Sequence, residues 1–88
     1  MKKLVSVTEV EGEGLESLLG EKVLLFCANY IYTGKLIGVN ATCVCLEDPA
    51  IVYETGDFAA PVYKDAQKLA PKTFYVQVRA IESFGAAR

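Results

Sequence analysis

Two glycines on either side of a leucine constrain this chain more than any other feature of its sequence. Gly34 and Gly38 flank Leu36 within residues 32–39, a β-prone stretch. Side chains two apart in a strand point the same way, so we expect these three residues to share one face. Glycines inside a strand mark a bulge, a bend or the close approach of another backbone. The stretch therefore predicts a sharply bent strand of the kind that curls a short sheet into a barrel.

The segments around this strand predict further strands and one short helix. Leucines at helical spacing in residues 15–19, followed by Gly20, predict one or two turns of helix. Apolar and alternating patterns predict four more strands. The five expected strands are residues 22–28, 30–39, 42–53, 74–78 and 80–84, with the third interrupted at Glu47-Asp48-Pro49.

Residues 56–73 show little alternation and contain Pro61 and Pro71, so they predict a long loop with a turn of helix around residues 65–69. A chain of 88 residues is too short for two independent cores. No repeat or linker divides it. We therefore expect a single domain over residues 1–88, with an all-β, five-stranded, strongly bent antiparallel fold and a short N-terminal helix.

The composition indicates a partner-binding protein of the cytoplasm. Apolar residues make up 52% of the chain, so we expect some apolar surface to meet a partner. The formal net charge of −2 argues against general coating of nucleic acid. Glu9, Glu11 and Glu13 interrupt the N-terminal apolar run too early for a signal peptide, and no stretch is long enough to span a bilayer. An odd set of three cysteines is typical of a reducing compartment.

The sequence lacks the common catalytic and metal-binding patterns. It contains no histidine, which excludes Ser-His and Cys-His nucleophile pairs. Cys43 and Cys45 share a strand face, but Cys27 is the only further thiol, so a closed four-ligand zinc site is not available. We interpret the cysteines as small packing residues, and Glu47 and Asp48 as solvated carboxylates at a turn. We expect no enzymatic activity, no metal and no cofactor.

Three fragments, in this order and at this spacing, resemble a known family. They are Leu18-Leu19-Gly20-Glu21-Lys22-Val23, Tyr32-Thr33-Gly34-Lys35-Leu36-Ile37-Gly38-Val39-Asn40 and Val78-Arg79-Ala80-Ile81. The first is similar to the helix-to-strand junction of the Sm and Sm-like (LSm) family, which includes the bacterial Hfq proteins. The second and third are similar to the two sequence motifs of that family. The resemblance covers residues 15–84 and implies an Sm-like, SH3-like barrel.

The resemblance also implies a site for single-stranded RNA. Family members that bind uridine-rich RNA hold a base between an aromatic side chain, from the turn after the second strand, and a basic side chain of the second motif. Here that turn is Asn40-Ala41-Thr42-Cys43, without an aromatic residue. Stacking contributes about 1–3 kcal/mol per base, so its loss weakens the pocket. The resemblance leaves Arg79, Asn40 and Thr42 as the candidate RNA-binding residues.

Ring assembly is the second implication of the resemblance. In the family, the fourth strand of one subunit pairs with the fifth strand of the next, and this head-to-tail contact closes a ring. The last two expected strands here are apolar and lack a guarding lysine or proline. The resemblance implies a homo-oligomer of five, six or seven subunits that repeats Arg79 around a pore. Two functions remain open: a non-catalytic ring that binds single-stranded RNA, and a structural or protein-interaction ring whose 56–73 loop and acidic N-terminal arm contact another protein.

Overall fold

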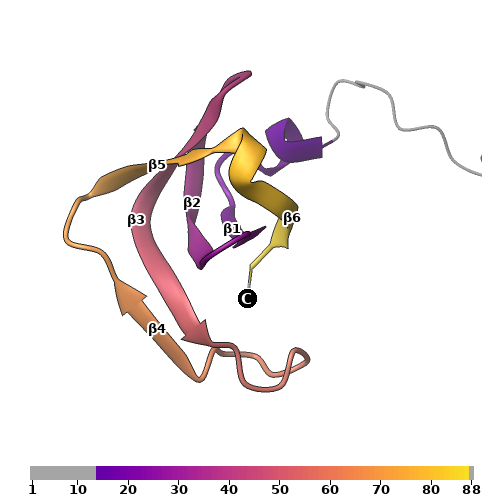
Figure 1. Ribbon diagram of the computed structural model, residues 1–88, viewed down its shortest axis with the longest axis vertical. Helices are drawn as coiled ribbons and strands as arrows, with labels where there is room; N and C mark the ends of the chain where they lie inside the picture. Colours follow the sequence, from indigo (N-terminus) through magenta and orange to yellow (C-terminus); the bar gives the residue numbers. More distant parts are fainter. Residues whose placement is uncertain (1–13, 88) are drawn as a thin grey trace, which may run out of the picture.

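The computed structural model describes residues 14–87, which form a mainly β fold. The elements are a 3-10 helix η1 (Gly14–Leu18), strands β1 (Lys22–Cys27), β2 (Ile31–Val39), β3 (Cys43–Glu54), β4 (Asp65–Lys68) and β5 (Thr73–Gln77), a 3-10 helix η2 (Val78–Ala80) and strand β6 (Ile81–Ala86). The strands belong to one strongly curved antiparallel sheet (Figure 1). The expected β fold and short helix are confirmed, whereas the N-terminal arm, residues 1–13, lies outside the described part of the chain.

The sheet is not closed into a barrel. Its strand order is β4-β3-β2-β1-β6, and β5 also pairs with β3. The last two strands, β5 and β6, follow each other through η2 but do not pair with each other. Within the described residues, β5 and β6 therefore each keep one edge without a partner strand. Neither described helix is long and apolar enough to cross a membrane.

The sharpest constraint on the sheet lies where β2 crosses the middle of β3. A Cβ atom placed on Gly34 would lie 3.1 Å from the carbonyl oxygen of Glu47 and 3.3 Å from Cα of Pro49. Both neighbours are backbone atoms, which cannot move aside cheaply. Gly34 is therefore required by the close approach of the two strands.

Gly38 lies on a different face of β2 from the one that its spacing predicts. The register pairs Leu36 with Leu46 and Gly38 with Cys45, and it shifts between these two pairs. A bulge of this kind reverses the alternation of inner and outer faces. Leu36 is consequently fully buried, while Gly38 lies against half-buried Cys45. The expectation that both glycines share a face with Leu36 is wrong for Gly38.

The inner face of the curved sheet carries one hydrophobic core. Its buried members are Val23, Leu25, Leu36, Val44, Leu46 and Val76, and Leu15 and Leu18 of η1 pack against them. Thr33 is the buried polar residue of the described chain, and its hydroxyl donates a hydrogen bond of 2.8 Å to the carbonyl oxygen of Val23. This bond satisfies a polar group that would otherwise destabilise the core.

Strand β3 continues through Glu47-Asp48-Pro49, where the sequence predicts an interruption. Its first half pairs with β5 and its second half with β4. Between the two halves, Asp48 has a φ of 51° and Pro49 has no N–H to donate. The interruption in the sequence pattern therefore marks the position at which β3 changes its partner.

Strand β4 corrects two predictions. Residues 65–68 form a strand instead of a turn of helix, so the 56–73 segment is not one continuous loop and the sheet has six strands instead of five. All four residues are exposed, which removes the apolar alternation that identifies a strand in a sequence. Strand β4 is held in place by backbone pairing with residues 50–54 of β3. This pairing satisfies N–H and C=O groups of β3 that would otherwise lack a partner strand on that edge.

Replacing Gly34 by alanine is expected to lower the free energy of unfolding by about 1–3 kcal/mol, because the added methyl group overpacks against the β3 backbone. Gly38→Ala is the matched control, since its methyl group meets only an ordinary contact of 3.5 Å with Cβ of Cys45. Urea unfolding monitored by circular dichroism measures both effects. Equal losses for the two variants would contradict the role given to Gly34.

Candidate functional site

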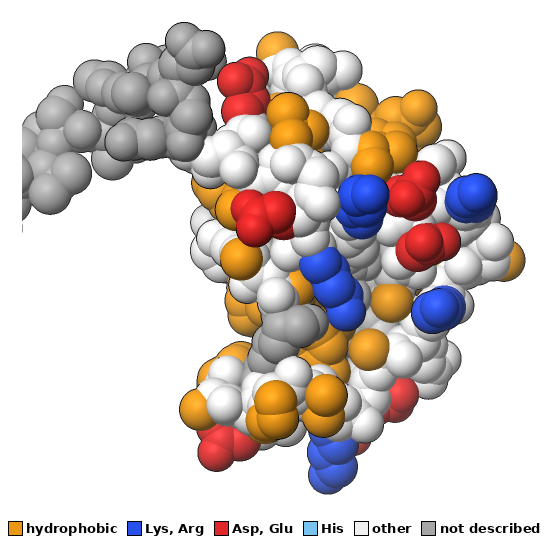
Figure 2. Space-filling view, turned by 180° about the vertical axis from the view of Figure 1, so that it is seen from behind, with side chains coloured by type: hydrophobic (Ala, Val, Ile, Leu, Met, Phe, Trp, Pro, Cys, Tyr) orange, Lys and Arg blue, Asp and Glu red, His pale blue; other side chains and the backbone are white. Residues whose placement is uncertain are grey.

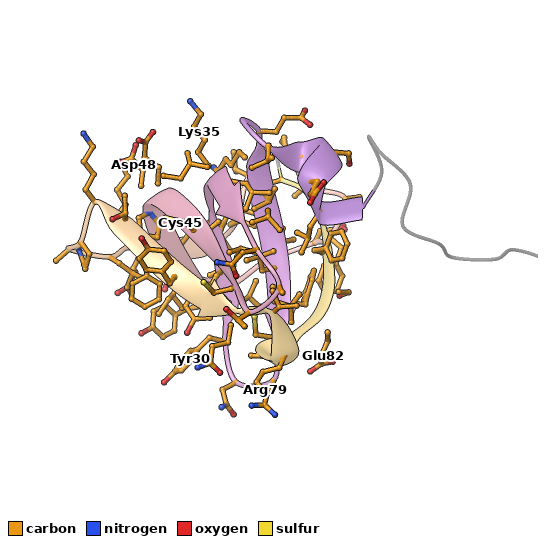
Figure 3. All side chains as sticks on the ribbon, turned by 90° about the horizontal axis from the view of Figure 1, so that it is seen from above. Tyr30, Lys35, Cys45, Asp48, Arg79 and Glu82 are labelled. Carbon is orange, nitrogen blue, oxygen red and sulfur yellow. The ribbon has the colours of Figure 1, made fainter. Side chains whose placement is uncertain are left out.

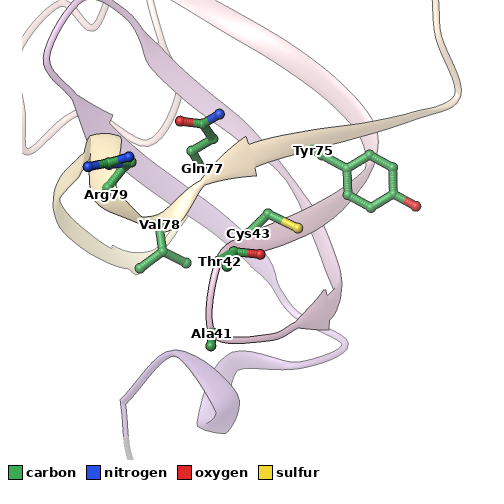
Figure 4. Close-up of a pocket in the computed structure, with 7 residues that line it drawn as sticks. All are labelled: Ala41, Thr42, Cys43, Tyr75, Gln77, Val78 and Arg79. Atoms are coloured by element: carbon green, nitrogen blue, oxygen red, sulfur yellow. The ribbon is translucent and has the colours of Figure 1, made fainter.

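A pocket of about 720 Å³ lies where the turn after β2 meets the junction of β5 and η2. The residues that line it come from these two segments: Ala41, Thr42 and Cys43 from the first, and Tyr75, Gln77, Val78 and Arg79 from the second (Figure 4). Two parts of the chain that are distant in sequence therefore build one site.

The turn that forms one wall of the pocket is held by Asn40. The side-chain oxygen of Asn40 accepts hydrogen bonds from the backbone N–H of Thr42 (2.8 Å), the backbone N–H of Cys43 (2.9 Å) and the hydroxyl of Thr42 (3.1 Å). An asparagine that bonds its own backbone two residues ahead forms an Asx-turn. Asn40 thus sets the shape of the wall without lining the pocket itself.

Backbone contacts fix the turn against the opposite wall. The N–H of Val78 donates to the carbonyl oxygen of Thr42 at 2.9 Å. The β3–β5 ladder pairs Cys43 with Gln77 and Cys45 with Tyr75. Because these are backbone interactions within the sheet, the pocket is built on rigid elements.

The pocket combines one cation, one exposed aromatic ring and several polar groups. Arg79 is the charged residue among those lining it, and it forms no ion pair with any other described residue. Tyr75 is 67% exposed, although an aromatic ring of this size is usually covered in a sheet. The Thr42 hydroxyl and the Gln77 amide add hydrogen-bonding groups. This combination suits a flat, polar and anionic ligand.

The structure brings together two of the three residues that the sequence predicts. Thr42 and Arg79 line one pocket, whereas Asn40 is not among the residues that line it. Sequence reasoning missed the contribution of Tyr75 and Gln77. Their alternation with Val76 in β5 is visible in the sequence, but only the pairing of β5 with β3 places them beside the turn that carries Thr42.

The three cysteines do not gather at one point. Cys43 and Cys45 stand on the outer face of β3, while Cys27 of β1 packs against the core. Burial, with a smaller contribution from the negative charge of Glu82, raises the pKa of the Cys27 thiol above its usual value. Within residues 14–87, no group of three or more potential ligands is placed to hold a metal ion.

A second, smaller pocket of about 490 Å³ mixes charges of both signs. Lys22, Lys35 and Lys68 line it together with Glu47 and Asp48. Figure 3 shows Lys35 and Asp48 at one end of the molecule and Arg79 at the opposite end. This pocket therefore holds carboxylates beside its lysines, whereas the lining of the Arg79 site contains a cation and no carboxylate.

Comparison with family models and with curated proteins identifies no relative of this chain. No family model matches the chain, and no curated protein matches it at a significant level. The geometry of the pocket and the sequence motifs therefore carry what can be inferred about function.

Replacing Asn40 by alanine is expected to cost about 1–2 kcal/mol of stability, because two backbone N–H groups and one hydroxyl lose their acceptor. Asn40→Asp keeps that acceptor and is expected to stay within about 0.5 kcal/mol of the wild type. Thermal unfolding compares the two variants. An alanine variant as stable as the aspartate variant would show that the turn does not depend on this side chain.

Proposed function

We propose that the protein is a non-catalytic, ring-forming protein of the Sm-like type that binds single-stranded RNA through the Arg79 pocket. The observation that carries this proposal is the meeting of Arg79, Thr42 and exposed Tyr75 in one pocket. Single-stranded nucleic acids are bound by aromatic rings that stack on bases and by basic groups that contact phosphates. Tyr75 supplies from β5 the aromatic surface that the turn after β2 lacks.

Open strand edges support the assembly of a ring. Both β5 and β6 have an edge without a partner strand in the described chain, and neither contains a lysine or a proline. Phe84 of β6 lies opposite fully buried Leu25 in the register, yet it is 44% exposed. Pairing of β6 with β5 of a neighbouring subunit would satisfy both edges and cover Phe84. Repeated head to tail, the contact closes a ring, for which we propose five to seven subunits.

Ring closure also reconciles an acidic chain with an anionic ligand. The formal net charge is −2, so a single subunit attracts RNA weakly. A ring repeats Arg79 once in every subunit, and a strand of RNA that contacts several copies gains from multivalency. The basic character of the proposed site therefore comes from repetition.

A second candidate function is a ring that binds another protein. It is favoured by exposed apolar side chains at the β3–β4 connection, where Tyr53, Phe58 and Val62 are 59%, 73% and 71% exposed. Figure 2 shows hydrophobic side chains gathered at the lower end of the molecule, where Figure 1 places this connection. Rings that bind no RNA in the titration described below would favour this candidate.

The ring proposal predicts that the purified protein has the mass of five to seven subunits in light scattering. Phe84→Glu is expected to shift it to monomers, because a charge would be buried at the joint between subunits. Phe58→Glu introduces the same charge at an exposed aromatic position away from β5 and β6, and it should leave the ring intact. A wild-type monomer would contradict the proposal.

The RNA proposal predicts that Arg79→Ala lowers the affinity for labelled single-stranded oligoadenine and oligouridine at least tenfold in fluorescence anisotropy at low salt. The affinity should fall as salt rises, because phosphate contacts release counterions. Lys35→Ala removes one positive charge at the opposite end of the molecule and should change the affinity less than threefold. Equal losses for the two variants would indicate nonspecific attraction instead of a pocket.

A further inference from the structure

Three neighbouring strands present a row of small residues that leads to Tyr75. The registers place Gly38 of β2 beside Cys45 of β3, and Cys45 beside Tyr75 of β5. Gly38 has no side chain, and Cys45 is small and half-buried. No bulky residue of this row stands over the Tyr75 ring, which is 67% exposed. One face of the ring is therefore accessible to a flat ligand.

Gln77 lies two residues further along the same face of β5. Figure 4 shows it between Tyr75 and Arg79 along the strand. It is exposed and lines the pocket, and its amide forms no hydrogen bond with any other described residue. The amide offers one acceptor and two donors at the edge of the space beside Tyr75.

Asn40, the other carboxamide near the pocket, is not available for the same task. Its oxygen already accepts three hydrogen bonds from Thr42 and Cys43. A carboxamide that recognises a base edge uses its N–H as donor and its oxygen as acceptor at the same time. Both groups must therefore be free of other hydrogen bonds. Among the residues that line the pocket, Gln77 is the carboxamide that meets this requirement.

We infer that Gln77 is the specificity-determining residue of the pocket and that it selects adenine, with the base stacked on Tyr75. This inference rests on the proposed function, because it names the nucleotide class for the same site. A glutamine amide matches adenine by donating to a ring nitrogen and accepting from the exocyclic amino group. Arg79 then remains available for the phosphate next to that base.

Adenine is favoured over the other bases for two physical reasons. It offers a ring nitrogen beside the amino group on both its Watson–Crick and its Hoogsteen edge, so two orientations of the base satisfy Gln77. Guanine, uracil and cytosine each offer a mixed donor–acceptor pair on one edge only, because the Hoogsteen edge of guanine presents two acceptors. The larger purine ring also covers more of Tyr75 than a pyrimidine does.

The test compares 5′-labelled heptamers of adenosine, uridine and purine riboside, the last of which lacks the exocyclic amino group. Fluorescence anisotropy with the wild-type protein should show oligoadenine binding at least fivefold more tightly than either of the others. Gln77→Ala should bring the affinities for oligoadenine and purine riboside within twofold of each other, and it should weaken oligouridine binding less than oligoadenine binding. Tyr75→Ala should weaken all three.

Two further variants separate base reading from general effects. Gln77→Glu keeps the shape of the side chain but presents acceptors alone, so it should lose the preference for adenine. Thr73→Ala alters an exposed residue on the same face of β5 outside the pocket and should retain the preference.

The outcomes distinguish this inference from the proposed function. Binding that depends on Arg79 but shows no preference for adenine, or a preference for adenine over purine riboside that survives Gln77→Ala, would overturn the inference and leave the RNA site in place. Failure of every heptamer to bind the wild-type ring at low salt would overturn the proposed function, and the inference with it.

Discussion

The close approach of two backbones at Gly34 is the constraint on which the rest of the structure depends. There β2 lies against β3 between Glu47 and Pro49, and a Cβ atom on residue 34 would be crowded by the backbone of both residues. On one side of this point β3 pairs with β5, and on the other side it pairs with β4. The contact therefore fixes the position of β5, and with it the wall of the pocket that carries Tyr75 and Arg79.

The sequence predicted most of the strands because their apolar residues report burial. It could not reveal β4, since a strand exposed along its whole length shows no alternation and is held by backbone pairing alone. It also misplaced Gly38, because the bulge between Leu36 and Gly38 is a property of the pairing with β3 and not of either residue. The interruption at Asp48-Pro49 was detectable in the sequence. That β3 changes its partner strand there could be seen only from the pairing of β3 with β5 and β4.

The site was predictable to the extent that its residues stand in recognisable motifs. Thr42 and Arg79 do, and the structure places them in one pocket. Tyr75 and Gln77 reach that pocket through the register of β5 against β3, which no local pattern encodes. Asn40 illustrates the opposite difficulty, because a sequence cannot distinguish an asparagine that shapes a turn from one that contacts a ligand. In the structure its side-chain oxygen accepts three hydrogen bonds within the turn.

Strand β4 has a consequence for how this fold tolerates change. It pairs with β3 alone, beyond the point where β5 ends its own pairing with that strand. The second half of β3, with β4, thus shares no pairing with β5, the strand that carries Tyr75 and Gln77 of the pocket. The segment that connects β3 to β4 can therefore gain or lose residues without altering the register between Cys43 and Gln77, so this part of the fold can diversify while the pocket is preserved.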